Sequence, residues 1–167
     1  KQSATLSDCM LKTSILERFC VDLCETLCFQ EASSSENGSA IPGFNGPHFL
    51  DWLQASNLFV IPLDDQHEWF RYHHLFRDFL QQELVRRSSS DEINELHAVA
   101  GRWYAQNDLI EEALSHLLAA GETQEAIHLI AQQRYRMMNT TQWPRLDRWL
   151  NSFLPTVIET SPELWMI

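Results

Sequence analysis

Lysine and glycine are scarce in this sequence of 167 residues. The two lysines are Lys1 and Lys12, and neither follows a glycine, which excludes the phosphate-binding loop G-x-x-x-x-G-K-[ST]. The five glycines form neither the G-x-G-x-x-G turn of dinucleotide-binding folds nor the G-x-S-x-G elbow of serine hydrolases. The zinc motif H-E-x-x-H is also missing. We therefore predict no catalytic residue in this chain.

Long apolar runs are also missing. The longest stretches, such as Leu58–Leu63, are much too short to span a bilayer. The N-terminal residues carry no charged segment followed by an apolar one, so no secretory signal is visible. We expect a cytoplasmic protein that has no membrane partner.

Basic residues are in the minority, with 12 Lys and Arg against 23 Asp and Glu and a net charge of −11. Affinity for DNA comes largely from Lys and Arg side chains that replace counterions on phosphates. An acidic surface is repelled by the polyanion at long range. Direct DNA binding by this segment is therefore not expected.

The four cysteines offer two interpretations. Cys20, Cys24 and Cys28 share one helix face at spacings of four residues, and Cys9 lies further upstream. A thiol cluster can hold a metal or sense oxidants, but this spacing matches neither a zinc site nor a disulfide framework. We favour reduced cysteines that pack as small hydrophobic side chains, as in the cytosol, and we predict no metal site.

The first half of the chain predicts a winged-helix domain over residues 1–88. Apolar spacing indicates helices, and two β-rich runs around a polar turn indicate a hairpin with an edge strand at Pro62. A loop rich in Ser, Gly and Asn separates the second helix from the third. The expected segments are helices at 7–19, 20–29 and 49–57, a loop at 31–47, and strands at 58–63 and 68–72.

The second half predicts helices in series. A helix over 74–87 should bury one apolar stripe, Asp91 should cap the next helix after a serine break, and Gly121 should end a later one. Pro144 should open another helix. We predict TPR-like helical hairpins over residues 89–167, and therefore a mainly α fold. The stripe expected to be buried in helix 74–87 comprises Leu75, Phe76, Phe79, Leu80 and Leu84.

The densest polar cluster is Arg71-Tyr72-His73-His74, where the second strand meets the helix that follows. Three roles are open for the two histidines. They can ligate a metal, they can cap or pack the helix, or they can bind phosphate, because imidazole donates to phosphate oxygens and a helix N-terminus favours anions. Arg71 and Arg77 add positive potential nearby.

Several runs together resemble one family, the MalT-like, large ATP-binding LuxR-type transcriptional regulators of bacteria, which belong to the STAND signalling ATPases. The resemblance covers essentially the whole chain. The runs are Leu11–Cys20, Asn57–Asp64, Trp69–Leu80, Ala105–Asp108 and Leu118–Gly121.

The resemblance implies a segment of a longer regulator, in which a P-loop domain binds ATP or ADP and a C-terminal helix-turn-helix binds DNA. This chain matches the winged helix and the start of the helical arm, and holds no cofactor itself. By the same resemblance, His73 contacts the β-phosphate of ADP in the resting form, with His74 as the alternative. Its expected partners are the P-loop and helical-repeat domains of its own chain, together with self-association of the longer protein.

Two other interpretations are open. The chain can be a freestanding helical-repeat adaptor, in which case the region from Asp91 onward should bind partners alone. It can also be a histidine-based metal hydrolase, which metal analysis would reveal.

Overall fold

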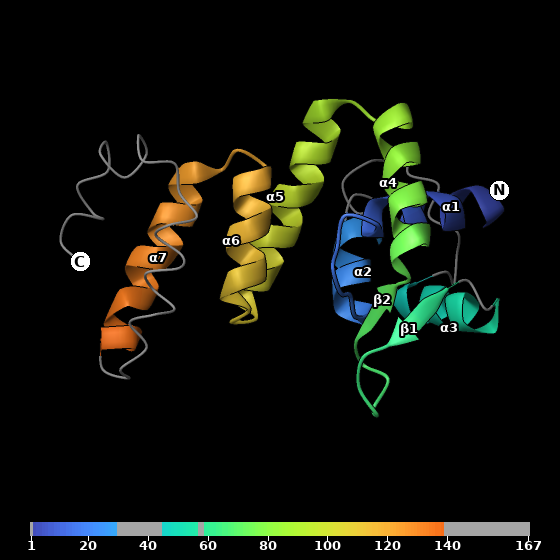
Figure 1. Ribbon diagram of the computed structural model, residues 1–167, viewed down its shortest axis with the longest axis horizontal. Coiled ribbons are helices and arrows are strands. Elements are labelled where there is room, and N and C mark those ends of the chain that lie inside the picture. The colour runs from blue at the N-terminus through green and yellow to red at the C-terminus, as the bar shows by residue number, and fades with distance from the viewer. Residues whose placement is uncertain (1, 30–44, 57–58, 139–167) are drawn as a thin grey trace. The chain divides into compact units, whose positions relative to one another are not determined.

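The computed structural model describes residues 2–29, 45–56 and 59–138. The chain divides into two compact units, with the boundary between Ala100 and Gly101. The first unit (Figure 1) holds helices α1 to α4, a two-stranded sheet and most of helix α5. Its elements before α5 are α1 (Gln2–Thr13), α2 (Val21–Phe29), α3 (Gly46–Ala55), β1 (Val60–Pro62), β2 (Phe70–Tyr72) and α4 (His74–Arg87).

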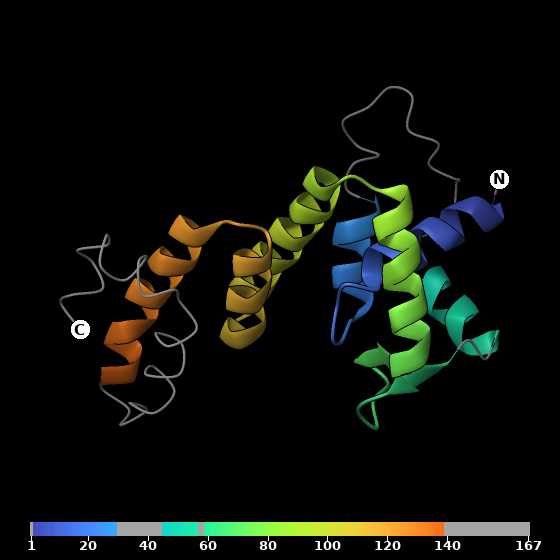
Figure 2. The same cartoon turned by 45° about the horizontal axis from the view of Figure 1, so that its top comes forward.

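The predicted hairpin is confirmed. Strands β1 and β2 pair antiparallel, with Val60 opposite Tyr72 and Pro62 opposite Phe70. Phe19, in the segment between α1 and α2, forms a further bridge to Phe70 through N–H···O bonds of 2.8 and 2.9 Å. Figures 1 and 2 both show the start of α4 meeting this hairpin. Helices, a small hairpin and a following helix make the predicted winged-helix arrangement.

Aromatic side chains form the centre of the first unit. Phe19, Phe49 and Phe70 are fully buried, and the Phe19 and Tyr72 rings lie 4.8 Å apart. Burial of each such side chain is worth about 1.5–3 kcal/mol. This core therefore fixes the hairpin, and with it the first residues of α4, against the first three helices.

The predicted helix over 7–19 is wrong, because α1 ends at Thr13. The Thr13 and Ser14 hydroxyls donate to the carbonyls of Cys9 and Leu11 at 2.7 and 2.6 Å. Such side-chain bonds to nearby carbonyls compete with helix continuation. The following residues form a turn and a bend instead, which brings Phe19 to Phe70.

The third helix starts earlier than predicted, at Gly46 rather than at residue 49. Asn45 caps it by accepting a hydrogen bond from the His48 N–H at 3.2 Å, and Pro47 lies in its first turn. Both residues are helix-start signals, although the sequence prediction placed them in the loop. The predicted second helix is confirmed, whereas most of the predicted loop lies outside the described residues.

Helix α4 has the predicted bounds, but the predicted cap of the next helix is wrong. Helix α5 (Ser90–Gln106) begins with a capping box in which Ser89 and Glu92 bond to each other's backbone N–H at 3.2 and 2.7 Å. Ser89 therefore takes the place predicted for Asp91.

The described part of the second unit contains the end of α5, then α6 (Ile110–Ala119) and α7 (Thr123–Met138), and α6 packs against α7. Gly121 ends α6 in a left-handed conformation with φ +81°, as predicted. A Cβ on Gly101 would lie 2.8 Å from Leu117 Cγ, so glycine permits close packing of α5 on α6. Arg102 forms a two-pronged ion pair with Glu125.

Some predictions about the second half are not tested. The helix expected at Pro144 lies outside the described residues. The division at residue 88 and the TPR-like character of the later helices stay predictions. Among the described helices, none combines the length and apolarity needed to cross a membrane.

Candidate phosphate-binding pocket

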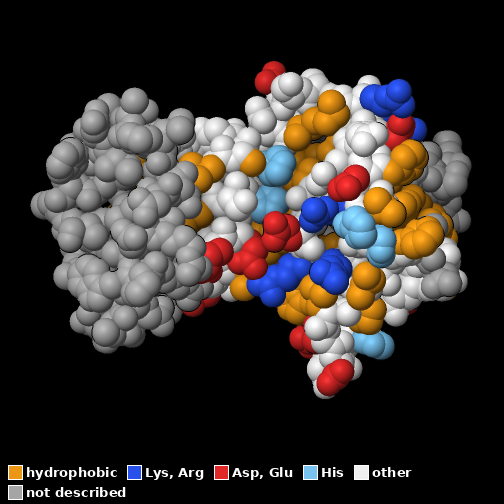
Figure 3. All heavy atoms as spheres, in the orientation of Figure 1, with side chains coloured by type: hydrophobic (Ala, Val, Ile, Leu, Met, Phe, Trp, Pro, Cys, Tyr) orange, Lys and Arg blue, Asp and Glu red, His pale blue; other side chains and the backbone are white. Residues whose placement is uncertain are grey.

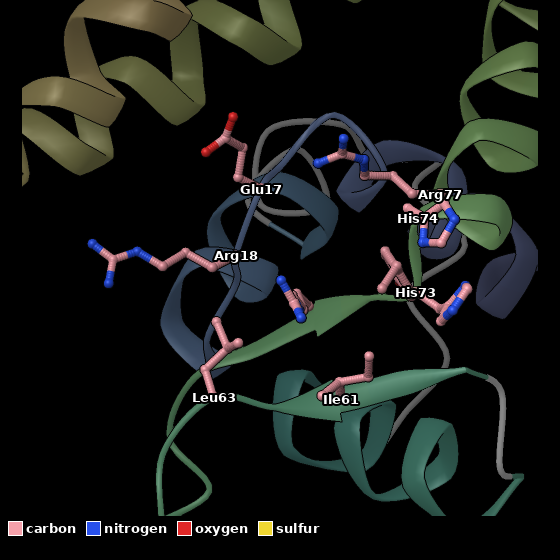
Figure 4. Close-up of a pocket in the computed structure, with 9 residues that line it drawn as sticks. Glu17, Arg18, Ile61, Leu63, His73, His74 and Arg77 are labelled. Carbon is pink, nitrogen blue, oxygen red and sulfur yellow. The ribbon is translucent and has the colours of Figure 1, made fainter.

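A pocket of about 560 Å³ lies in the first unit, where the hairpin meets the start of α4 (Figure 4). Its apolar wall comes from Ile61, Leu63 and Tyr72. Its charged and polar lining is unusual for so acidic a chain, because basic side chains outnumber acidic ones. This lining consists of Arg18, Arg71, Arg77, His73, His74 and Glu17.

His73 occupies the N-cap position of α4. Its backbone N–H donates to the Phe59 carbonyl at 2.7 Å, and its own carbonyl accepts from the Arg77 N–H at 3.0 Å. Its side chain makes no capping hydrogen bond, so this imidazole does not satisfy the first amides of the helix. The ring stays available to a ligand at the place where a helix favours an anion.

The two predicted site histidines lie together on this pocket. The His73 and His74 ring centroids are 4.3 Å apart, and the Phe59 ring lies 6.3 Å from that of His73. Phe59 adopts the left-handed region at φ +49°, which is unusual for an aromatic residue. Its carbonyl thereby meets the His73 N–H, so the residue before β1 helps to hold the histidine in place.

Three arginines approach the pocket from three different elements. Arg71 is an exposed β2 residue, and Arg77 is a half-buried residue in the second turn of α4. Arg18 stacks over the Trp69 ring at 4.7 Å, and in Figure 4 it points away from the histidines. Glu17 is the one acidic side chain among the described residues that line this pocket, so the local potential is positive and favours an anion.

Sequence reasoning missed the contribution of Glu17 and Arg18. The helix predicted over 7–19 contains both, whereas they lie in the segment after α1 whose Phe19 bridges to β2. The signal that could have located them is the pair Thr13-Ser14, whose hydroxyls end α1.

A buried hydroxyl pair ties the pocket to α1. The Tyr72 hydroxyl lies 2.8 Å from the Thr13 hydroxyl, and Gln81 of α4 donates to the Ser14 carbonyl at 2.9 Å. Burial raises the pKa of Tyr72 well above its usual value, so the phenol stays neutral. Because Tyr72 directly precedes His73, these contacts fix the position of the histidine relative to the first helix.

Apolar side chains next to the pocket are exposed, contrary to our prediction. Leu75 and Phe79 are 67% and 57% exposed, whereas Leu80 and Leu84 are buried. Each pair is spaced by four residues, but Leu80 is rotated by about 100° from Phe79 around the helix. The apolar stripe predicted for this helix spans more of its circumference than one packing partner can cover. The side of α4 that carries Leu80 faces the core. Figure 3 shows apolar, basic and histidine side chains gathered over β2 and the start of α4.

None of the four cysteines is among the described residues that line this pocket. All four are free thiols; Cys9 and Cys24 are buried, as predicted for small hydrophobic side chains. Burial raises the pKa of Cys24 well above its usual value, which keeps the thiol protonated and a poor metal ligand. Within the described ranges, no group of three His, Cys, Asp or Glu side chains is arranged to hold a metal ion.

Comparisons with known proteins agree with the fold. A family model for the MalT winged helix domain matches residues 1–92. The serine/threonine-protein kinase PknK of Mycobacterium tuberculosis is 34% identical over 128 residues, covering 76% of this chain and 10% of PknK. The HTH-type transcriptional regulator MalT of Klebsiella pneumoniae is 32% identical over 124 residues, and that of Yersinia enterocolitica 29% over 123 residues.

Both MalT alignments cover 74% of this chain and 14% of the relative, so the chain spans only a small part of the proteins it matches. The family model, by contrast, covers more than half of the present sequence and coincides with the helices and hairpin described above. The chain therefore belongs to the MalT winged helix domain family.

Proposed function

We propose that this chain is the nucleotide-sensing module of an ATP-dependent transcriptional regulator. Its pocket would read the phosphates of a nucleotide held by a separate P-loop domain of the same protein. The observation that carries the proposal is the position of His73, at the N-cap of α4 and on a pocket that also contains three arginines. Two imidazoles, guanidinium groups and a helix N-terminus all favour phosphate oxygens.

The proposed contact acts by biasing an equilibrium between two states. A hydrogen bond from His73 to a charged phosphate is worth about 1.5–3 kcal/mol. If it forms only in the ADP-bound resting state, it shifts the population toward that state by roughly tenfold for each 1.4 kcal/mol. Loss of the histidine should therefore release the regulator from its resting form.

The apolar side chains beside the pocket support the docking of another domain. Leu75 and Phe79 of α4, together with Phe59, are more than half exposed, and the Phe59 ring lies 6.3 Å from that of His73. Exposed apolar clusters rimmed by polar groups typically mark protein interfaces. A P-loop domain that covers this face would bring its nucleotide to the pocket and exclude water from it.

The relay to the helical region would pass along α4 and α5. Gln81 bonds α4 to the end of α1, and the capping box at Ser89 starts α5 two residues after α4 ends. Because the Gln81 bond holds α4 to α1, a displacement of His73 would move the two helices together and reach α5 through a very short connection.

Recognition of DNA would belong to another part of the longer protein. The surface of α3 presents Pro47, His48, Asp51 and Gln54, and the helix contains no Lys or Arg. A helix that reads a DNA groove needs side chains that contact phosphates and base edges. A freestanding adaptor is less well supported, because the family match is to a winged helix over residues 1–92 rather than to a helical repeat.

The experiment uses the longer regulator that carries this chain, with a promoter reporter and no inducer. We expect His73→Ala to raise the activity about tenfold or more, with a smaller effect for His74→Ala. His128→Ala is the control, because this exposed histidine lies on α7 of the second unit. If both pocket variants fold normally and stay as inducer-dependent as the parent, the sensor assignment is wrong.

A further inference from the structure

Arg77 is the pocket residue whose surroundings point most directly to a missing partner. We propose that Arg77 is the principal cationic contact of an anion site that binds diphosphate groups, with the two histidines at its edge. This inference rests on the proposed function, because it concerns the same pocket. It adds a principal contact residue that the histidines alone do not define.

Helix geometry brings Arg77 to the same face as the histidines. Arg77 follows His73 by four residues and His74 by three, which are the spacings of neighbours on a helix surface. All three line the pocket. In Figure 4 the Arg77 side chain reaches from α4 toward the segment that carries Glu17.

The hydrogen-bonding state of Arg77 is unusual. Its Nε is buried, yet it meets no acceptor among the described residues. Other arginines are satisfied, since Arg86 pairs with Glu83 at 2.9 Å and Arg102 donates to Glu125 from two nitrogens. A buried unpaired donor on a cation is costly, so a small shift of this guanidinium toward an acceptor on a ligand in the pocket would stabilise it.

The chemistry of the lining selects a phosphate group. A guanidinium group binds two oxygens of one phosphate through parallel N–H donors, which a single ammonium or imidazole cannot do. The first amides of α4, which the His73 side chain leaves uncapped, suit a second phosphate. A pocket of about 560 Å³ has room for both. The phosphates can come from a bound nucleotide or from free inorganic diphosphate.

The test titrates inorganic pyrophosphate into the present chain and follows the backbone amides by NMR. We expect roughly millimolar binding that weakens as salt is added, with the largest shifts at the start of α4. R77Q should reduce the affinity about tenfold, and R77K should restore only part of it. R86Q removes the same charge from the same helix and should change the affinity less than twofold.

Three results would overturn the inference. One is equal pyrophosphate affinity for R77Q and the parent when both have the same circular dichroism spectrum and melting temperature. Another is an equal loss in R86Q, which would indicate a general charge effect. The third is a set of shifts that maps away from the pocket, which would indicate an adventitious ion only.

Two further measurements distinguish a nucleotide from free diphosphate as the ligand, and the Arg77 site from the His73 sensor. ADP should bind the present chain no more tightly than pyrophosphate, and AMP more weakly, if the pocket contacts only the terminal phosphates. Tighter ADP binding would overturn a site restricted to phosphate. If R77Q loses pyrophosphate binding while His73→Ala leaves the longer regulator inducer-dependent, the Arg77 site stands and the histidine sensor fails.

Discussion

The hydroxyl pair between Thr13 and Tyr72 makes an asymmetric prediction about stability. Thr13 Oγ1 already donates its proton to the Cys9 carbonyl at 2.7 Å, so the Tyr72 hydroxyl, 2.8 Å away, must be the donor to Thr13. Tyr72→Phe removes this donor and leaves Thr13 with its other bond. Thr13→Val removes the acceptor and leaves the buried Tyr72 hydroxyl without one.

The two substitutions should therefore differ in cost. Loss of one net hydrogen bond in Tyr72→Phe should lower the free energy of unfolding by about 1 kcal/mol. An orphaned buried hydroxyl costs roughly 1–3 kcal/mol, so Thr13→Val should lower it by about 2 kcal/mol. Both side chains are almost completely buried, at 0% and 3% exposure, so solvent cannot replace the lost partner.

Urea unfolding followed by circular dichroism measures these differences. For the first unit, residues 1–100, each 1 kcal/mol corresponds to roughly 4–8 °C in melting temperature. The double variant should cost less than the sum of the single ones, because Tyr72→Phe removes the orphaned group that Thr13→Val creates. A larger loss for Tyr72→Phe than for Thr13→Val, or strict additivity, would refute this reasoning.

Three other predictions concern regions outside the pocket. Gly101→Ala should lower the melting temperature of the second unit by several degrees, because its Cβ would lie 2.8 Å from Leu117 Cγ; unchanged melting would contradict the close packing of α5 on α6. The hydrogen bond from Arg102 lowers the pKa of Glu125, so this pair stabilises the fold above the ordinary pKa of 4.5 and loses that effect as the pH falls through the lowered value. Arg102→Gln should therefore lower the free energy of unfolding by about 0.2–1 kcal/mol at neutral pH and by almost nothing in acid. Urea unfolding at both pH values measures this difference. An equal loss at both would exclude a role for the ion pair. The buried Cys24 thiol should react with a disulfide reagent much more slowly in the native chain than in urea, and equal rates would contradict its burial.

The hairpin and α4 could be predicted from sequence because their signals are local. Alternating β-rich residues surround the polar turn at Asp64, whose carboxylate accepts hydrogen bonds from the N–H groups of Glu68 and Trp69 at 2.9 and 2.8 Å. Backbone donors of this kind, led by that of Glu68, also lower the pKa of Asp64. The turn is therefore specified by neighbouring residues alone.

The errors arose where a tertiary partner decides the outcome. Apolar spacing marked both Leu75 and Leu80 as buried, but only the packing of α4 on α1 selects the Leu80 side. Likewise, Phe19 has the spacing of a helical stripe, and only its bridge to Phe70 shows that it lies outside a helix. The histidines were found because they are adjacent in sequence, whereas Glu17 and Arg18 reach the pocket only through the fold.

We propose that His73 holds the β-phosphate of ADP in the resting state of the longer regulator. The most direct test of this proposal is the rate at which a fluorescent ADP analogue leaves that protein, compared between the parent and His73→Ala. We expect about tenfold faster release of the ADP analogue from His73→Ala, with the affinity for ATP unchanged. Release at the parental rate from a correctly folded variant would contradict it.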